Sequence, residues 1–421
     1  MILGKHAGAL LLLLPWLIFI VLLPLFPHEA MAAALRGVSI WWEVLFPALL
    51  PFFIIAELLL GIGLVHLIGS LFDPMMKPVF RVPGYGGFIM AMGFASGYPI
   101  GARLTAQLWE ERLITREEGE RLVAFTTSSD PIFLIGAVCV GFFHDPSLAV
   151  ILAAAHYGGG LLVGFGMRFH GGRTDAEQFV HRERVPPLHP LTYVKRAIND
   201  MHRARIADGR SLIRMLQDAI QTSLKLVFII GGLVVFISVL LELLTAIGGM
   251  RILYLAVQHT LGVLGLPAGL AEALVNGMFE VTLGAQAAGV ALADSSLIHQ
   301  VAVAAFVLSW AGLSVHAQII SLLTSTNLRY LPFVIARLGH GLISMLLVYL
   351  LWKPLSSLRE AAAATTAGFG ESLTPLKLGV ASVPILFLGV LMLIPILYLL
   401  YLVMMRVIRL IRPQPSRSTH D

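Results

Sequence analysis

Long apolar stretches alternate with short polar segments along almost the whole chain. Most stretches reach the roughly 20 residues that a helix needs to cross a hydrocarbon core about 30 Å thick. The stretches expected to cross the bilayer are residues 9–25, 39–66, 119–143, 147–169, 221–247, 297–322, 330–352 and 376–402. This pattern predicts an all-α polytopic membrane protein with about eight transmembrane helices.

Two further apolar stretches, residues 84–108 and 266–292, are interrupted by glycine and polar residues near their middle. The first contains the run GFASGYP at 93–99, and the second contains NGMFEVT at 276–282. A break in a helix at membrane depth leaves unpaired backbone groups, which are tolerated only where protein covers them or water fills a cavity. We therefore expect two re-entrant helical hairpins.

The composition agrees with a membrane protein. Of 421 residues, 57% are hydrophobic and only 13% are charged, compared with about 25% charged residues in soluble domains. The mean hydropathy is +0.86.

Cys139 is the single cysteine, so the chain has neither a disulfide framework nor a cluster of thiolate metal ligands. No HExxH, P-loop or Rossmann motif occurs, so the sequence does not indicate an enzyme, and we expect no cofactor and no metal.

The basic residues, which give a formal net charge of +5, gather in particular loops. If each hairpin enters and leaves by the same face, loops 70–83, 109–118, 170–220 and 323–329 share one side with the C-terminus. The positive-inside rule makes that side cytoplasmic and places both termini there. The same rule explains the basic charge, so we expect a lipid bilayer and no nucleic acid as partner. Small residues at 30–33 resemble a signal-peptidase site; we expect an uncleaved first helix, with a cleaved signal as the alternative.

The second half of the chain repeats features of the first. Residues 56–63 match 241–248, 100–102 match 283–285, and 155–160 match 336–341, at shifts of 181 to 185 residues. Since the matched spans cross the bilayer in opposite directions, the sequence predicts two inverted-topology repeats. Transporters built in this way hold their substrate near the bilayer midplane, between broken helices.

Polar residues inside the first repeat are candidates for such a site, because polar side chains in the hydrocarbon are costly. Thr126, Thr127, Ser128, Ser129 and Asp130 precede a proline and predict a broken helix. They contact either a substrate or ion, or a buried packing network. Facing them, the first hairpin offers Ser96, Gly97, Tyr98 and Arg103. Helix N-termini at such breaks favour anions, and Arg103 either strengthens this preference or extends to the membrane surface.

In the second repeat the candidates are Glu280, Thr282, Ser309, His316 and Arg337. Glu280 is the strongest candidate for coupling to H⁺ or Na⁺, because a buried carboxyl group can exchange protons near neutral pH. The alternative is a structural ion pair between Glu280 and Arg337. For His156, in the first repeat, the simpler interpretation is a buried histidine whose hydrogen bonds are satisfied.

Three segments resemble those of a known family: LFPALLPFF at 45–53, GFASGYPIGA at 93–102 and EGERL at 118–122. Over residues 40–350 the chain is similar to the sporulation integral membrane protein YlbJ family, also called the stage V sporulation protein V family. The resemblance implies nucleoside-recognition, or Gate, domains and a likeness to concentrative nucleoside transporters, with their two hairpin-containing inverted halves. It also implies transport of dipicolinate toward the spore across the outer forespore membrane.

The resulting hypothesis is an alternating-access transporter of a small anionic aromatic substrate. The alternatives are a nucleoside or nucleobase transporter and a non-transporting sporulation scaffold. A homo-oligomer is compatible with each of these three roles. We divide the chain into an N-terminal helix (1–38), a first Gate-like repeat (39–170), a basic cytoplasmic loop (171–220), a second Gate-like repeat (221–353), and a linker with the last helix and a basic tail (354–421).

Overall fold

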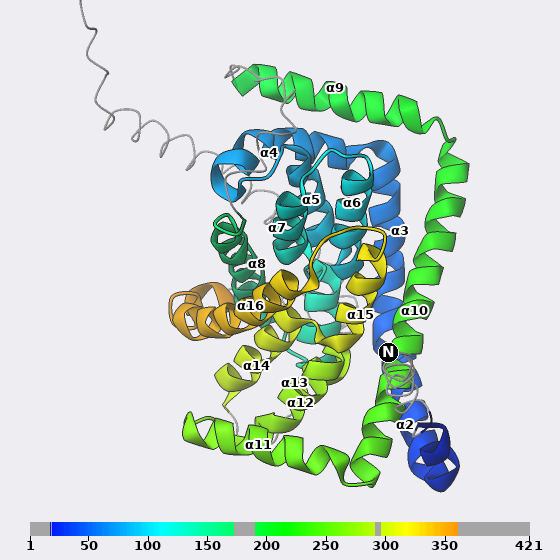
Figure 1. The fold of residues 1–421 in the computed structure, drawn as a ribbon, viewed down its shortest axis with the longest axis vertical. Helices are drawn as coiled ribbons and strands as arrows, with labels where there is room; N and C mark the ends of the chain where they lie inside the picture. The colour runs from blue at the N-terminus through cyan, green and yellow to red at the C-terminus, as the bar shows by residue number, and fades with distance from the viewer. Residues whose placement is uncertain (1–16, 18, 172–189, 291–295, 361–421) are drawn as a thin grey trace, which may run out of the picture.

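A computed structural model describes residues 17, 19–171, 190–290 and 296–360, and within these residues the chain is helical, without strands (Figure 1). The expected all-α class is confirmed. The span expected at 376–402, and most of the one expected at 9–25, lie outside the described residues.

From Pro27 onward the chain forms one long helical stretch. Helix α2 (Pro27–Ser39) continues through the π-helical η1 (Ile40–Leu45) into α3 (Phe46–Ile62). Residue 39, where we expected a boundary, therefore lies inside a continuous stretch of helix. The stretch ends at Gly63, whose φ of 86° is left-handed, a conformation that glycine adopts at little cost.

Residues 70–83 were expected to form a loop, and this was wrong for most of the segment, because α4 (Leu64–Phe80) occupies it. The helix is amphipathic. Met76 and Phe80 are buried on one face, in a cluster with Ile89 and Phe125. Since helix α4 places its apolar residues on one face only, the segment lacks the continuous apolar run of a span.

The first hairpin comprises α5 (Tyr85–Ser96) and α6 (Tyr98–Glu110), which pack against each other and are separated only by Gly97. Helix α7 (Arg116–Thr126) follows, and residues 127–130 are not helical. The chain continues through η2 (Phe133–Phe142), a short η3 (Pro146–Leu148) and α8 (Ala149–Met167). The break predicted within 119–143 is thus confirmed.

The basic segment between the repeats is more than a connector. It contains α9 (Pro190–Asp208), which packs against α4, and Ser70 Oγ donates to Asp200 Oδ2 at 2.6 Å. At the turn after α9, hydrogen bonds from Arg210 lower the pKa of Asp208 to about 2.

Helix α10 (Leu212–Ala246) then runs roughly 50 Å, at about 1.5 Å per residue. It therefore begins well before the span expected at 221.

The second half repeats the order of elements in the first. Gly248, with φ of 76°, precedes the amphipathic α11 (Gly249–Val263), as Gly63 precedes α4. After the short η5 (Ala268–Leu270), α12 (Ala271–Phe279) and α13 (Val281–Val290) form the second helical pair. Helices α14 (Leu297–Trp310) and α15 (Gly312–Leu323) form a second broken helix, and α16 (Tyr330–Leu351) is unbroken, like α8.

Within the described residues, four helices are long and apolar enough to cross a membrane, or five if the bent pair Phe19–Leu25 and Pro27–Leu45 counts as one span. These are Pro146–Met167, Leu212–Ala246, Leu297–Leu323 and Tyr330–Leu351. Of the other spans that we expected, 39–66 and 119–143 are interrupted by π-helix or by a break, so they do not form one long regular helix.

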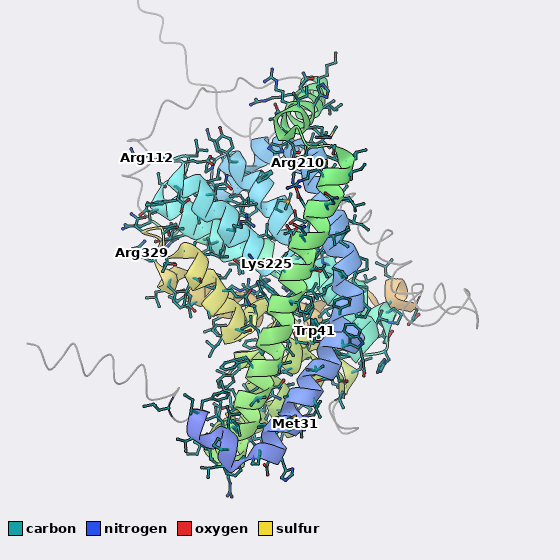
Figure 2. The ribbon with its side chains drawn as sticks, turned by 90° about the vertical axis from the view of Figure 1, so that its right-hand side faces the viewer. Met31, Trp41, Arg112, Arg210, Lys225 and Arg329 are labelled. Carbon is teal, nitrogen blue, oxygen red and sulfur yellow. The ribbon has the colours of Figure 1, made fainter. Side chains whose placement is uncertain are left out.

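The two amphipathic helices lie at opposite ends of the molecule. Helices α4 and α9 lie at one end, hereafter the α9 end, and α11 lies at the other (Figure 1). Arg112, Arg210 and Arg329 lie toward the α9 end, whereas Met31 lies toward the α11 end (Figure 2). Described residues of the four segments that we expected on one side of the membrane therefore lie in the half of the structure toward the α9 end.

An ion-pair cluster connects the two halves at the α9 end. The Glu120 carboxylate, on α7, accepts hydrogen bonds from the Arg329 backbone N–H at 2.9 Å and from Arg329 Nη2 at 2.8 Å. His170 Nε2 lies 2.6 Å from the same carboxylate. The Glu120 side chain is only 1% exposed. Ser325 Oγ also donates to Glu110 at 2.6 Å, so the segment between α15 and α16 is fastened to both α6 and α7.

Candidate functional site

Four interruptions of helices meet in two pairs between α4 and α11 (Figure 1). Gly97, between α5 and α6, lies beside Asp130, and a Cβ at Gly97 would be 3.1 Å from Asp130 Oδ2. In the second half, Glu280 separates α12 from α13 and lies beside Gly312, at the break between α14 and α15. In each half, the break in the helical pair thus faces the break in the following helix.

Both helical pairs fold back tightly on themselves. In the first pair, Thr126 fits between the two helices, which we call the arms of the pair. Gly93 of α5 and Gly101 of α6 both contact its carbonyl group. In the second, the arms touch directly, since a Cβ at Gly284 would lie 2.3 Å from Gly277 Cα. A larger residue at these glycines would separate the arms.

The two carboxyl groups at the breaks bind backbone N–H groups of their own segments. Asp130 Oδ1 accepts from the N–H groups of Ile132 and Phe133 at 3.0 and 2.9 Å. Glu280 Oε2 accepts from Leu283 N–H at 2.9 Å, and Thr282 Oγ1 donates to Glu280 Oε1 at 3.3 Å. A negative charge is stabilised at a helix N-terminus, so these N–H groups offset part of the cost of burying each carboxylate.

A buried hydrogen-bond network crosses from the first half to the second through His156. Its Nε2 lies 2.9 Å from Ser128 Oγ and accepts from Ser129 N–H at 3.1 Å. Its Nδ1 lies 2.9 Å from Ser309 Oγ, which donates to Ser344 Oγ at 2.9 Å. Separately, Tyr98 donates its hydroxyl hydrogen to the Leu308 carbonyl at 2.8 Å. The polar residues predicted in the two repeats are therefore in contact.

Arg337, on α16, is fully buried beside this network, with 0% exposure. Its Nη1 donates to the Thr127 carbonyl and lies 3.0 Å from His340 Nδ1. Its Nε and Nη2 have no hydrogen-bond partner among the described residues. A buried charge without a partner costs several kcal/mol, and two of the three nitrogens of this guanidinium are left for a ligand or water.

The structure brings most of the predicted site residues together. Gly97, Tyr98, Thr126, Thr127, Ser128, Ser129, Asp130, Ser309 and Arg337 are joined by the contacts above, and Glu280 and Thr282 lie at the neighbouring break. Ser96 precedes Gly97, and its buried Oγ also has no partner among the described residues. His316 lies at the edge, where its ring nitrogens contact the Tyr330 hydroxyl and the Trp310 carbonyl.

The described contacts distinguish between alternatives that the sequence left open for two arginines. Arg103 is exposed on α6, where the nearby charge is Glu57 of α3, so it does not join the other residues. The buried Ala102 next to it points to the core instead, and one residue along a helix turns the side chain by about 100°. Nor does Arg337 form an ion pair with Glu280, since the described contacts of Arg337 are those with Thr127 and His340.

Sequence reasoning missed His340 and Ser344 as parts of the site. Both share one face of α16 with Arg337, at spacings of three and seven residues. A polar stripe at this spacing in an apolar helix indicates an inward face, and this signal could have identified them. The described residues contain no group of three or more His, Cys, Asp or Glu side chains that could hold a metal ion.

Comparison with known proteins gives three matches. A family model described as nucleoside recognition (Gate) matches residues 42–160. The sporulation integral membrane protein YlbJ of Bacillus subtilis (strain 168) is 44% identical over 329 residues, which cover 78% of this chain and 79% of that protein. A solved structure of a CNTnw double variant in an outward-facing state is 15% identical, with a TM-score of 0.48, and covers 84% of this chain and 86% of its own.

Proposed function

Because this chain belongs to the sporulation integral membrane protein YlbJ family, we propose that it transports a small anionic aromatic solute across the membrane, with dipicolinate as the substrate. The observation that carries this proposal is the fully buried Arg337, with Nε and Nη2 unpaired among the described residues. Dipicolinate is a planar pyridine dicarboxylate, and a carboxylate supplies the charge that the guanidinium lacks.

In this proposal the solute moves by alternating access between two inverted halves, each with one re-entrant hairpin. The breaks at Gly97, Asp130, Glu280 and Gly312 surround the substrate, since broken helices next to a binding site are typical of such transporters. The ion pair between Glu120 and Arg329 closes the α9 end and opens when substrate passes there. Both termini are cytoplasmic, and in a sporulating cell the protein lies in the outer forespore membrane and exports dipicolinate from the mother cell.

A second candidate, nucleoside or nucleobase transport, is favoured by the description of the family model that matches residues 42–160. A neutral nucleoside could fill the same position but would leave the charge of Arg337 uncompensated. The two candidates therefore differ in the charge of the solute.

Uptake into proteoliposomes separates them. We expect the purified protein to take up labelled dipicolinate and not labelled uridine, and Arg337→Gln to abolish the uptake. Arg112→Gln, a matched change of an exposed arginine at the α9 end, should leave the uptake unchanged. Uridine uptake without dipicolinate uptake would reject the anionic substrate, and uptake of neither would favour the scaffold.

A further inference from the structure

The unpaired nitrogens of Arg337 form one edge of its guanidinium group. Nε–H and Nη2–H point in the same direction in the plane of the group and together form the fork that binds a carboxylate through two parallel hydrogen bonds. The other terminal nitrogen, Nη1, is already bonded to the Thr127 carbonyl and His340. The chain thus occupies one side of the guanidinium and leaves this edge without a partner in the described structure.

The contacts of His340 assign its protons. An arginine nitrogen can only donate, so His340 Nδ1, which lies 3.0 Å from Arg337 Nη1, must be the acceptor. His340 Nε2 lies 2.7 Å from the His156 carbonyl and must therefore carry the hydrogen. Both nitrogens of a neutral imidazole are then used, and a charged imidazolium would direct an N–H at the guanidinium.

His156 fixes His340 in turn. Its Nε2 accepts from the Ser129 N–H, so Nδ1 carries the hydrogen and donates to Ser309 Oγ. The two imidazole rings stack, with centroids 5.0 Å apart and planes inclined by 28°. Arg337 therefore contacts a neutral His340, which donates to the carbonyl of His156, and the His156 ring is held by serines of both halves.

We propose that the Nε and Nη2 edge of Arg337 binds one carboxylate of the substrate side-on, and that His340 is the positioning residue that keeps this edge free by holding Nη1. This inference rests on the proposed function and specifies how that function recognises its substrate. The Thr127 carbonyl and His340 Nδ1 both present partial negative charge, which excludes an anion from the Nη1 side. The edge accommodates a single carboxylate, so a pyridine with one acid group should bind, whereas its neutral amide should not.

Binding can be measured separately from transport. In detergent, we expect picolinate to raise the melting temperature of the wild-type protein and picolinamide to leave it unchanged. Arg337→Lys should abolish the shift with picolinate, because an ammonium group is a point donor that lacks the planar fork. Equal shifts with picolinate and picolinamide would overturn the proposal, and this comparison needs no variant.

The role of His340 is tested by two substitutions of similar size. In His340→Asn, the amide oxygen lies near the position of Nδ1 and still accepts from Arg337; in His340→Gln, the amide lies near Nε2 and leaves Nη1 without this acceptor. We expect His340→Asn to keep KM for dipicolinate within about threefold of wild type. His340→Gln should raise KM about tenfold, the equivalent of about 1.4 kcal/mol, with little change in the maximal rate.

Several outcomes would contradict the inference. Unchanged KM in both His340→Gln and Arg337→Lys would overturn it while leaving the proposed function intact, since transport itself would persist. A fall in the maximal rate at constant KM would show that His340 serves only the fold. Conversely, a wild-type protein that binds picolinate through Arg337 but does not transport dipicolinate would contradict the proposed function and support the carboxylate site.

Discussion

At the scale of single residues, the buried charges of this protein differ in how they are compensated. Asp130 and Glu280 both accept backbone N–H groups next to a helix break. Arg337 instead has only one of its three guanidinium nitrogens bonded within the described structure. Since an unpaired buried cation is costly, Arg337 is the residue whose environment an anionic ligand improves most.

Gly97 is required by the backbone at the first hairpin break. Its φ of 87° and ψ of −177° fall in a region that is essentially restricted to glycine. We expect Gly97→Ala to lower the stability of the protein by about 1–3 kcal/mol and to reduce uptake, as measured by thermal unfolding in detergent and by proteoliposome flux.

Gly232→Ala provides the control, because Gly232 lies in α10 with no neighbour within 4 Å of an added Cβ. That change should be neutral, or stabilise by about 0.5–1 kcal/mol through the helix preference of alanine. Equal effects of the two substitutions would show that the break does not depend on the conformation of Gly97.

Glu280 carries the hypothesis of coupling. If its carboxyl group exchanges the coupling proton, Glu280→Gln should abolish the stimulation of uptake by a pH gradient, since an amide cannot release a proton. Exchange of labelled for unlabelled substrate at equal pH should continue, because it requires no net proton movement. Undiminished stimulation in the variant would assign coupling to another group or to Na⁺.

At the scale of elements, the structure shows why some segments differ from the apolar runs of the sequence. Helices α4 and α11 are shorter than the candidate spans and α9 is more polar, yet all three segments form helices because each needs to bury only one face. The segment before α16 is equally informative, since it fastens the second half to α7 through Arg329 and Glu120.

We expect Arg329→Ala to destabilise the ion-pair cluster at the α9 end. Glu120 would lose both hydrogen bonds from the Arg329 guanidinium, while the backbone N–H of residue 329 and His170 would still contact its carboxylate. Hydrogen bonds between charged groups are stronger than neutral ones, so their loss should lower stability. The variant should unfold at a lower temperature in detergent, and Glu120→Gln with Arg329→Ala should recover part of the loss because the carboxylate charge is then absent. A double variant no more stable than Arg329→Ala would contradict this explanation.

At the scale of the whole molecule, the two halves repeat one order of elements, and the amphipathic helices α4 and α11 lie at opposite ends (Figure 1). The inverted repeat that we propose would produce this arrangement, because the second half would then face the other way in the membrane. The distribution of loops between the two ends predicts which residues share a compartment.

Cysteine labelling tests this orientation. In a Cys139→Ala background, cysteines at Arg112, His202 and Asn327, all exposed, should react with an impermeant reagent only from the cytoplasmic side. Cysteines at Arg251 and His259, exposed on α11, should react only from the other side. Labelling of both sets from one face would reject the predicted topology.

The sequence alone was sufficient to predict the all-helical membrane fold, the positions of the helix breaks and most of the polar residues around them. These properties are local, because an apolar run of given length, a glycine or a proline constrains its own segment whatever surrounds it. The amphipathic helices were harder, since their apolar residues are interspersed with polar ones and resemble a loop.

Only the tertiary structure decided which residues face one another. Arg103 and Arg337 are both arginines in apolar segments, yet one is exposed on α6 and the other is enclosed by Thr127 and His340. The difference depends on the rotation of each helix against its neighbours, which a single sequence does not specify. The physical reason is that burial and pairing arise from contacts between distant segments, whereas helix formation and membrane insertion depend on residues that are adjacent in the chain.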